Sequence, residues 1–345
     1  MKKYLLRRDG QFYKVNLHCH STVSDGYYSP EQIKKMYKEQ GYSAVAFTEH
    51  NIMISHADLN DDGFVALHGF EAEFNEPYGE GTGKNFYDIK TAHICFIALD
   101  PDNLVHPFWH RTKYQDNGNV AKYVPMAQFR EDEPDFERSH TPECINHAIK
   151  LGRERGFFVS YNHPTWSLES YPDYIAYENM NAMEIYNTTS HWQGYDEYAP
   201  RVYDDMLRAG KRIVCTATDD NHNHNHAPLP DSFGGFTMVK AEHLDYKSIM
   251  SALCEGQCYA SNGPLIDELW YEDGKVHVKC SPASAIDFST DRRHSARIYN
   301  KDGSAVVEGS FELDSKDKYV RVTITDFEGN HANSRAYFAD EFEEK

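Results

Sequence analysis

Short apolar runs alternate with amphipathic segments through the first three quarters of the chain. The runs have the length and composition of buried strands, and they cover residues 15–20, 44–48, 64–68, 92–99, 157–161, 183–186 and 213–218. Segments with helical periodicity lie between them, which is typical of βαβ units. The pattern therefore predicts an α/β fold with a parallel sheet or barrel for this part of the chain.

Two of the predicted helices have clear start and stop signals. Ser29 is placed to be an N-cap, Pro30 occupies the first helical position, and Gln32 completes a capping box. Gly41 is the stop signal of this helix, and Thr141 with the proline after it opens a second one. Two further helices are expected to end at glycines 210 and 256. These signals support the alternating α/β pattern.

The pattern changes beyond about residue 260, where short alternating runs are separated by turn signals. Asp273-Gly274, Asp302-Gly303 and the segment 328–330 each have the composition of a hairpin turn. We therefore expect a first domain over residues 1–260 and a small, sandwich-like all-β domain over residues 261–345.

Two irregular segments, 75–90 and 101–140, interrupt the first domain. They are rich in Gly, Asp, Asn, Pro and Glu, with scattered aromatic residues. Loops of this length inside a compact domain are usually functional or disordered. We expect them to take part in binding, and Lys84, His110, Arg111 and Arg130 are their candidate substrate-binding side chains.

Charge and composition limit the kinds of binding partner and the cellular compartment that we expect. The formal net charge is −19, which disfavours a nucleic-acid duplex or an anionic membrane surface and favours a small-molecule substrate. The N-terminal segment is too polar for a signal peptide or a membrane span, so we expect a cytoplasmic protein. Seven cysteines, an odd number, fit a reducing compartment, and we interpret Cys254 and Cys258 as ordinary buried thiols.

Histidines and carboxylates recur at the ends of the apolar runs. His18 and His20 are two residues apart and so share one face of a strand, but a chain with 19 histidines contains about one such pair by chance. A single histidine in this position is more often a hydrogen-bonded core residue than a ligand. The support for a metal site comes from the number of strands that end in such residues. Burying that many polar side chains is costly unless they bind a cation. Mixed imidazole and carboxylate ligands suit Zn²⁺, Mn²⁺ or Fe²⁺.

The order and spacing of these motifs resemble the PHP (polymerase and histidinol phosphatase) domain over roughly residues 14–225. The motifs are His18-x-His20, Ser24-Asp25-Gly26, Thr48-Glu49-His50, Gly69-x-Glu71, His93, Asn162-His163-Pro164 and Asp220-x-His222. The C-terminal region resembles the CehA/McbA-type subgroup, whose members carry a C-terminal β domain. The resemblance implies a distorted (β/α)7 barrel, which is TIM-barrel-like, and a trinuclear metal centre.

The resemblance also implies three ligand sets. They are His18, His20, Glu71 and Asp220 for one ion, Glu71, His93 and His163 for a second, and Asp25, His50 and His222 for a third. Two positions depart from the family pattern or leave a choice. Glu49 replaces the usual Asp, at a position that is not usually a ligand, and only spacing favours Asp220 over Asp219. Glu73 competes with Glu71 because the two share a strand face.

The expected activity is hydrolysis of a small phosphomonoester or phosphodiester. Two neighbouring ions lower the pKa of a bridging water, so that hydroxide attacks while the ions neutralise developing charge. We assign catalytic roles to Glu71, Asp220 and His222. Hydrolysis of a carboxylic or carbamate ester on the same site is the alternative, and a purely structural metal site is a third possibility. Within the polar run 221–226, we expect only His222 to be a ligand. The oligomeric state is left open.

Overall fold

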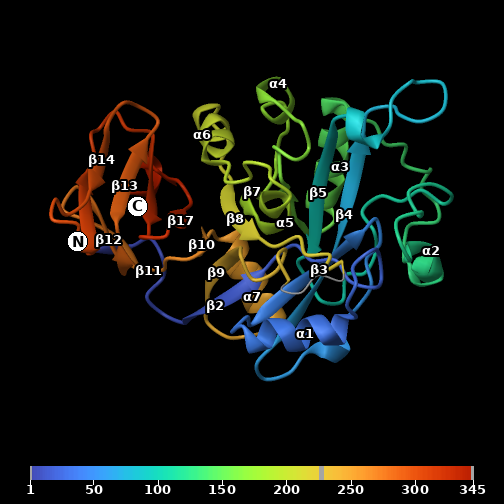
Figure 1. The fold of residues 1–345 in the computed structure, drawn as a ribbon, viewed down its shortest axis with the longest axis horizontal. Helices are drawn as coiled ribbons and strands as arrows, with labels where there is room; N and C mark the ends of the chain where they lie inside the picture. Colours follow the sequence, from blue (N-terminus) through green and yellow to red (C-terminus); the bar gives the residue numbers. More distant parts are fainter. Residues whose placement is uncertain (1, 225–228, 343–345) are drawn as a thin grey trace.

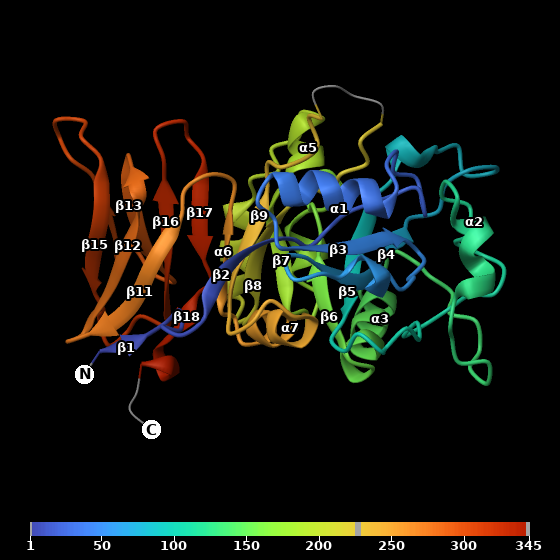
Figure 2. The same cartoon turned by 90° about the horizontal axis from the view of Figure 1, so that it is seen from below.

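The structure is a computed structural model that describes residues 2–224 and 229–342. It has two parts, an α/β part and a β-rich part that lie side by side (Figure 1). β1 (Lys3–Tyr4), near the start of the chain, and β18 (Tyr337–Phe338), near its end, both lie at the β-rich part (Figure 2).

Seven strands of the α/β part follow one another in the sheet in chain order. They are β2 (Gln11–Asn16), β3 (Ala44–His50), β4 (Val65–Asn75), β5 (Thr91–Ala98), β6 (Phe157–Tyr161), β7 (Ala182–Asn187) and β8 (Val214–Thr218). Each predicted run corresponds to one of them. β4 extends well past its predicted end, to Asn75. β2 lies nearer the N-terminus than predicted and ends before His18 and His20, so both histidines lie in the segment that follows the strand.

The sheet is mixed rather than parallel. The pairs β2–β3, β3–β4, β6–β7 and β7–β8 are parallel, but β5 is antiparallel to both β4 and β6. The loop 76–90 joins β4 to β5 without a long crossover helix, so β5 returns in the opposite direction. The distorted (β/α)7 barrel that the resemblance implies is therefore not confirmed.

The seam beside β8 is closed by side chains. β9 (Phe236–Ala241) pairs with β2, and among the described residues the ladder of β8 is formed with β7. The hydroxyl of Thr237 accepts a hydrogen bond from the Ala217 N–H (3.2 Å) and donates one to the Ala217 carbonyl (3.1 Å). Gly235 allows this approach, because a Cβ there would lie 2.2 Å from the Thr218 carbonyl oxygen.

The helices include the two that the sequence signals predict. The α-helices are α1 (Pro30–Glu39), α2 (Val120–Tyr123), α3 (Pro142–Glu154), α4 (Tyr171–Tyr174), α5 (Thr188–Trp192), α6 (Pro200–Arg208) and α7 (Tyr246–Cys254). Four short 3-10 helices are η1 (Ala57–Leu59), η2 (Phe86–Asp88), η3 (Val124–Met126) and η4 (Ala339–Glu341). Ser29 caps α1 with a capping box, and Thr141 caps α3. Figure 2 shows α1 and α7 on opposite sides of the strands.

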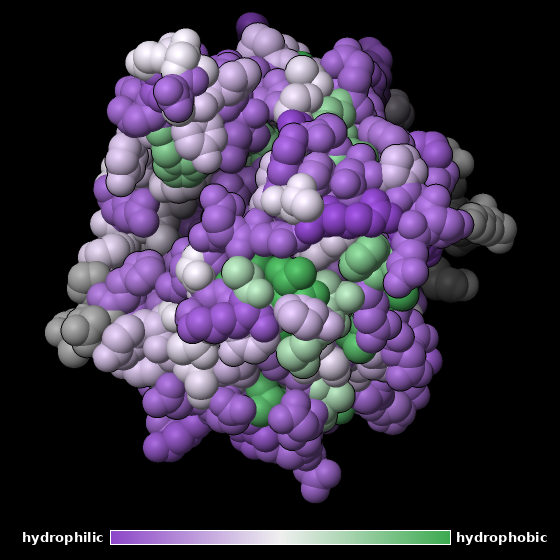
Figure 3. Space-filling model, turned by 90° about the vertical axis from the view of Figure 1, so that its right-hand side faces the viewer, coloured by the Kyte–Doolittle hydropathy of each residue, from purple (hydrophilic) through white to green (hydrophobic). Residues whose placement is uncertain are grey.

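The irregular segment 101–140 folds over one end of the α/β part, where it carries α2 and η3. Val120 packs there with Val23 and Ile52 in a small apolar cluster. Figure 3 shows the face that carries α2, on which polar side chains dominate and apolar ones gather near the centre. A small apolar cluster thus anchors the segment to the rest of the α/β part.

The β-rich part is a sandwich of two sheets. One sheet contains β1 (Lys3–Tyr4), β11 (Ile266–Glu272), β12 (Lys275–Ala283) and β15 (Val306–Glu312). The other contains β13 (Ala285–Thr290), β14 (Ser295–Ile298), β16 (Tyr319–Thr325), β17 (His331–Ser334) and β18 (Tyr337–Phe338). Apolar side chains of both sheets, including Leu269, Val278 and Val322, form one core.

The predicted boundary at residue 260 does not interrupt the sheet. β10 (Cys258–Ser261) pairs with β9 on one side and with β17 on the other. The N-terminal strand β1 pairs with β11, so the first residues of the chain belong to the β-rich part. The turns at 273–274 and 328–330 form hairpins, whereas the turn at 302–303 connects β14 to β15 in the opposite sheet.

All seven cysteines are free thiols. Cys258 is buried as expected, but Cys254 is exposed, because it lies in the last turn of α7 on the side away from the strands' core. Among the described residues, no helix is both long and apolar enough to cross a membrane.

Candidate metal centre

The candidate ligands gather at one end of the strands of the α/β part. His50 ends β3, Glu71 lies within β4, and His163 follows β6. His93 lies near the beginning of β5, because the antiparallel direction of that strand brings its first residues to this end. The remaining candidates follow β2 and β8; they are His18, His20, Asp25, Asp220 and His222.

Two of these residues have left-handed backbone conformations. His163 has a φ of 23° and Asp220 a φ of 54°. The Asp220 N–H donates to the carbonyl of His18 (2.9 Å), which holds the segment after β8 against the segment after β2. Backbone strain of this kind is maintained where the surrounding structure fixes a functional side chain.

The first group of ligand atoms is fully buried and comprises His18, His20, Glu71 and Asp220. The Nε2 atoms of His18 and His20 are 3.2 Å apart, and Asp220 Oδ1 lies 3.2 Å from the first and 3.0 Å from the second. Glu71 Oε1 lies 3.2 Å from His18 Nε2. A tetrahedral ion with bonds of about 2.0–2.1 Å has ligand atoms about 3.3 Å apart, so these spacings fit one ion.

The second group shares Glu71 with the first and adds His93 and His163. Glu71 Oε1 lies 3.1 Å from His93 Nδ1 and 3.3 Å from His163 Nε2. One carboxylate therefore faces both groups, which is the arrangement expected of a bridging ligand.

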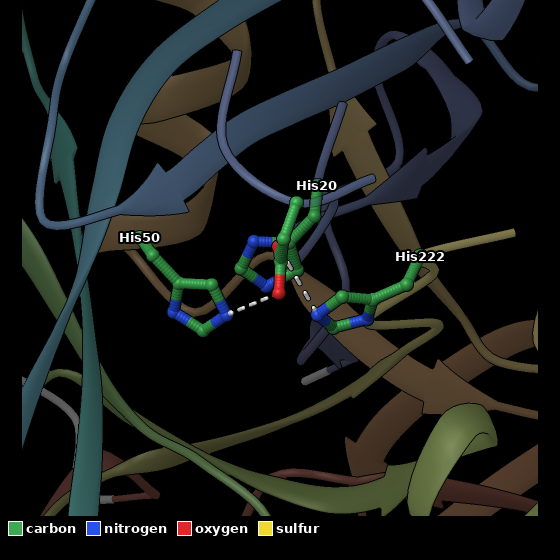
Figure 4. A group of neighbouring side chains, drawn as sticks. His20, His50 and His222 are labelled. Carbon is green, nitrogen blue, oxygen red and sulfur yellow. Dashed lines mark ion pairs between the residues drawn. The ribbon is translucent and has the colours of Figure 1, made fainter. Parts of the chain in front are cut away.

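The third group lies toward solvent and comprises His20, Asp25, His50 and His222. Asp25 lies 3.6 Å from a ring nitrogen of His50 and 3.6 Å from one of His222. The ring of His20 stacks between the other two, with centroids 4.2 and 4.3 Å away (Figure 4). Asp25 and His222 are half-buried, so this group is the one open to the cavity.

The chemistry of the site fits divalent cations. Asp220 Oδ1, which belongs to the first group, is buried without a hydrogen-bond partner, and binding to an ion would satisfy it. Burial lowers the pKa of His50, but Asp25 and Glu71 raise it to about 10. Glu71 and Asp220 likewise raise the pKa of His163 to about 9 against the effect of burial. The carboxylates thus require positive charge, and the mixed donor set suits Zn²⁺, Mn²⁺ or Fe²⁺.

A cavity of about 470 Å³ opens over these groups. Its walls come from the two irregular segments and from the loops after β6, β7 and β8. Besides seven of the nine ligand candidates, the lining residues are Glu73, Tyr78, Phe86, Asp116, Asn117, Gly118, Trp166, Thr189, Ser190, Trp192, Gln193, His224 and Asp231. Both irregular segments therefore contribute to the site, as their length suggested.

Comparison with protein families matches the PHP domain to residues 16–255. The chain belongs to the PHP domain family. A comparison with curated proteins found no match.

The chain also matches solved structures at low sequence identity. A two-domain protein from Bacteroides vulgatus with a predicted PHP-like metal-dependent phosphoesterase has 14% identity and a TM-score of 0.44, covering 97% of this chain and 98% of that one. An amidohydrolase from Chromobacterium violaceum with bound sulfate has 14% identity and a TM-score of 0.35, covering 60% of this chain and 87% of that one.

Glu184 is a buried residue of this PHP domain that contacts two candidate ligands and that the sequence pattern did not reveal. Its Oε1 accepts from His18 Nδ1 (2.7 Å) and Thr218 Oγ1 (2.7 Å), and its Oε2 accepts from the His163 N–H (3.0 Å) and Asn187 Nδ2 (2.9 Å). Since Glu184 holds the proton on His18 Nδ1, the Nε2 lone pair faces the first group. The only sequence signal is a carboxylate inside an otherwise apolar run.

Glu49 and Asp219 are buried carboxylates that organise the backbone around the site. Glu49 accepts from the backbone N–H groups of Ser21 (3.0 Å) and Ser24 (3.1 Å), and so shapes the loop that carries Asp25. Asp219 accepts from Tyr37 and from the N–H groups of residues 233–235. Neither belongs to a ligand group, whereas Asp220 does, as the spacing indicated.

Glu73 lies beside the ligand groups without joining one. Its Oε1 is 3.8 Å from His50 Nδ1 and accepts from Asn51 Nδ2 (3.0 Å) and from the amide of Asn117. Its Oε2 accepts from Asn75 (3.3 Å). These amides occupy the carboxylate, so Glu71 is the residue of the pair that faces the ions' positions.

The predicted substrate-binding residues Lys84, His110, Arg111 and Arg130 do not line the cavity, which corrects that expectation. Acidic residues of their own loops pair with them instead. Arg111 contacts Asp135 (2.6 Å), and the other pairs are Lys84–Glu76 (3.5 Å), His110–Glu137 (3.1 Å) and Arg130–Glu133 (3.8 Å). The folding of the loops, which sequence spacing does not reveal, sets these pairings.

The histidine run after β8 contributes to the site in part. His222 belongs to the third group, and the ring of His224 stacks on it with centroids 5.3 Å apart. The N–H groups of His222 and Asn223 donate to Asp231. His226 lies outside the described residues, so the prediction of a single ligand in this run is untested there.

Proposed function

We propose that this PHP protein is a metal-dependent hydrolase of small phosphoesters. The observation that carries the proposal is the set of nine His, Asp and Glu side chains in three overlapping groups beneath a cavity. Such a cluster exceeds the four ligands of a closed structural site, which makes a purely structural role a poor fit.

The ions would be held by the three groups described above. When bound, divalent ions supply Lewis acidity that activates water and neutralises charge on phosphoryl oxygens. Glu71 belongs to two of the groups, so its carboxylate would help to hold two neighbouring ions, an arrangement used in two-metal sites of phosphatases and nucleases. The donor set is compatible with Zn²⁺, Mn²⁺ or Fe²⁺, and we propose up to three ions per chain.

The chain's own residues orient the groups that face the cavity. His222 Nδ1–H donates to the backbone carbonyl of Asp220 (2.9 Å), which leaves Nε2 directed toward Asp25. Trp166 packs against the rings of His93 and His163 and shields the second group from solvent. A substrate therefore approaches across the third group, where Asp25 and His222 are partly exposed.

Hydrolysis of carboxylic or carbamate esters is a second candidate, and one observation favours it. Among the described residues, no lysine or arginine lines the cavity, while four aromatic side chains do; they are Tyr78, Phe86, Trp166 and Trp192. A neutral aromatic ester would fit such walls. The ions themselves supply the positive charge for a phosphoryl group, so phosphoester hydrolysis remains the leading proposal.

The two candidates are separated by substrate assays on protein stripped of metal and reloaded with Mn²⁺, Zn²⁺ or Fe²⁺. We expect release of p-nitrophenol from p-nitrophenyl phosphate or its bis ester, loss of that activity with chelator, and a fall of at least about a hundredfold in Glu71→Gln. Glu154→Gln, an exposed control on α3, should match the wild type. Hydrolysis of naphthyl acetate or a naphthyl carbamate alone would favour the second candidate, and no hydrolysis by fully loaded protein would contradict both.

A further inference from the structure

The wall of the cavity beside the second ligand group is a row of aromatic rings. The Trp166 ring lies 4.9 Å from that of His163 and 5.2 Å from that of His93. The Phe86 ring follows at 6.1 Å from Trp166, and the Tyr78 ring at 6.0 Å from Phe86. The row therefore leads from the ligand groups to the mouth of the cavity, where Tyr78 is 47% exposed.

The row is fixed in place close to the ligand groups. The indole N–H of Trp166 donates to Gln193 Oε1 (2.9 Å), and two backbone N–H groups at residues 165 and 166 donate to the buried Glu197 (3.1 and 2.8 Å). Asn85 caps the short helix that carries Phe86. The part of a substrate that extends from the ligand groups along this row would contact an aromatic surface that is already in place.

Carboxylates that are not in the ligand groups also line the cavity; they are Glu73, Asp116 and Asp231. Glu73 and Asp231 accept hydrogen bonds from amides and backbone N–H groups, as described above. Asp116 is exposed and makes no hydrogen bond or ion pair within the part of the chain that the structure describes. Burial and the charges of Glu73 and Asp116 together raise the pKa of Tyr78, which agrees with both carboxylates facing the end of the row.

An aromatic row that lies beside carboxylates, in a cavity that no described lysine or arginine lines, favours a particular kind of ligand. Organic ammonium groups are attracted to the faces of aromatic rings, and quaternary ammonium ligands are recognised by aromatic cages. A carboxylate adds to this attraction and repels a second anionic group. A neutral aromatic group would contact the rings equally well but would gain nothing from Asp116.

We propose that the cavity binds a phosphoester whose alcohol portion carries an organic ammonium group. The phosphoryl group lies over the ligand groups, and the ammonium lies along Trp166, Phe86 and Tyr78 near Asp116. This inference rests on the proposed function and deepens it by naming the substrate class.

The test compares phosphocholine with its neutral carbon isostere, 3,3-dimethylbutyl phosphate, on metal-loaded protein. We expect kcat/KM to favour phosphocholine by about tenfold or more, which corresponds to the strength of a cation–π contact supported by a carboxylate. Asp116→Asn and Phe86→Leu should each reduce this ratio about threefold or more. Asp102→Asn, an exposed control in the loop after β5 that does not line the cavity, should leave the ratio unchanged.

A second readout does not require turnover. Calorimetric titration of choline should show binding to the wild type that weakens in Asp116→Asn and in Phe86→Leu. Equal kcat/KM for the two phosphoesters together with no choline binding would overturn the inference, while hydrolysis of p-nitrophenyl phosphate in the same preparation would leave the proposed function standing. Choline binding without hydrolysis of any phosphoester would support the ammonium site and contradict the proposed function.

Discussion

Burial of so many ionisable side chains at one place is the main feature at the scale of single residues. His18, His20 and Glu71 are almost completely inaccessible to solvent. Side chains of this kind are costly to bury without compensating charge, and among the described residues no lysine or arginine lines the cavity over them. Neighbouring carboxylates such as Glu184 therefore determine the orientation and the tautomer in which the imidazoles face an ion.

Replacement of Glu184 by Gln tests this positioning role. The amide keeps the volume of the side chain but loses the charge that holds the proton on His18 Nδ1. We expect metal affinity to fall about 10- to 100-fold, measured by competition with a chelating dye. Glu178→Gln, which alters an exposed carboxylate that pairs with Lys211 away from the ligand groups, is the control. Unchanged affinity in Glu184→Gln would show that the carboxylate does not orient the ligand.

His106 links stability to pH at a site away from the ligand groups. Burial, with a smaller effect of Arg138, lowers its pKa to about 3. Below about pH 6.5 the unfolded chain binds a proton that the folded protein does not, so stability should fall by up to about 1.4 kcal/mol per pH unit from pH 6.5 toward pH 3.

Urea unfolding of chelator-treated protein between pH 7 and pH 4.5 measures this effect. His106→Gln should be less stable at pH 7, because it repacks a buried site, but its stability should depend less steeply on pH than that of the wild type. His243→Gln, which alters an exposed imidazole, should have the wild-type slope. Identical slopes for wild type and His106→Gln would contradict the prediction.

At the scale of elements, the sequence predicted where the strands lie along the chain better than it predicted their directions in the sheet. The apolar periodicity located seven strands, and Ser29 and Thr141 marked the starts of their helices. Strand direction depends on the connections, so the antiparallel course of β5 was not apparent from its residues. The motif order nevertheless brought together all nine candidate ligands, because those residues lie at strand ends whose place the fold determines. The wall residues Tyr78, Phe86 and Asp116 lie in the two irregular segments, whose course the apolar periodicity does not specify.

Substitution of Gly235 tests how closely the backbone before β9 packs against β8. In Gly235→Ala, the new methyl group would meet the Thr218 carbonyl oxygen at 2.2 Å, and the backbone there has little room to move. We expect a loss of about 2 kcal/mol or more in unfolding free energy, measured by urea denaturation. Gly63→Ala is the matched control, since its Cβ would approach no atom closer than 3.4 Å. A stability equal to that of the control would mean that the seam is not a close contact.

At the scale of the whole molecule, the two parts share a sheet and a buried ion pair. The continuous ladder β9–β10–β17 connects them, and β1 returns the N-terminus to the β-rich part. Arg321 of β16 is 5% exposed and contacts Asp204 of α6 at 2.7 Å. We therefore expect the two parts to unfold in one cooperative transition.

Replacement of Arg321 by Met tests this coupling. Loss of the guanidinium leaves Asp204 without its buried partner, so we expect a loss of about 3–5 kcal/mol and a separation of the thermal transition into two steps. Arg297→Met removes an arginine that contacts Asp287 at the same 2.7 Å on the surface and should cost about 1 kcal/mol or less. Equal losses in the two variants would contradict the role assigned to the buried pair.

The most direct test of the central claim is phosphate release from p-nitrophenyl phosphate as a function of metal bound per chain. Chelator-stripped protein is titrated with Mn²⁺ or Zn²⁺, and bound metal is measured by elemental analysis. We expect no activity without metal, a rise as occupancy exceeds one ion per chain, and no comparable rise in Glu71→Gln. Protein that binds two or three ions per chain and still releases no phosphate would contradict the phosphoesterase assignment, and protein that binds less than one ion would contradict the metal centre itself.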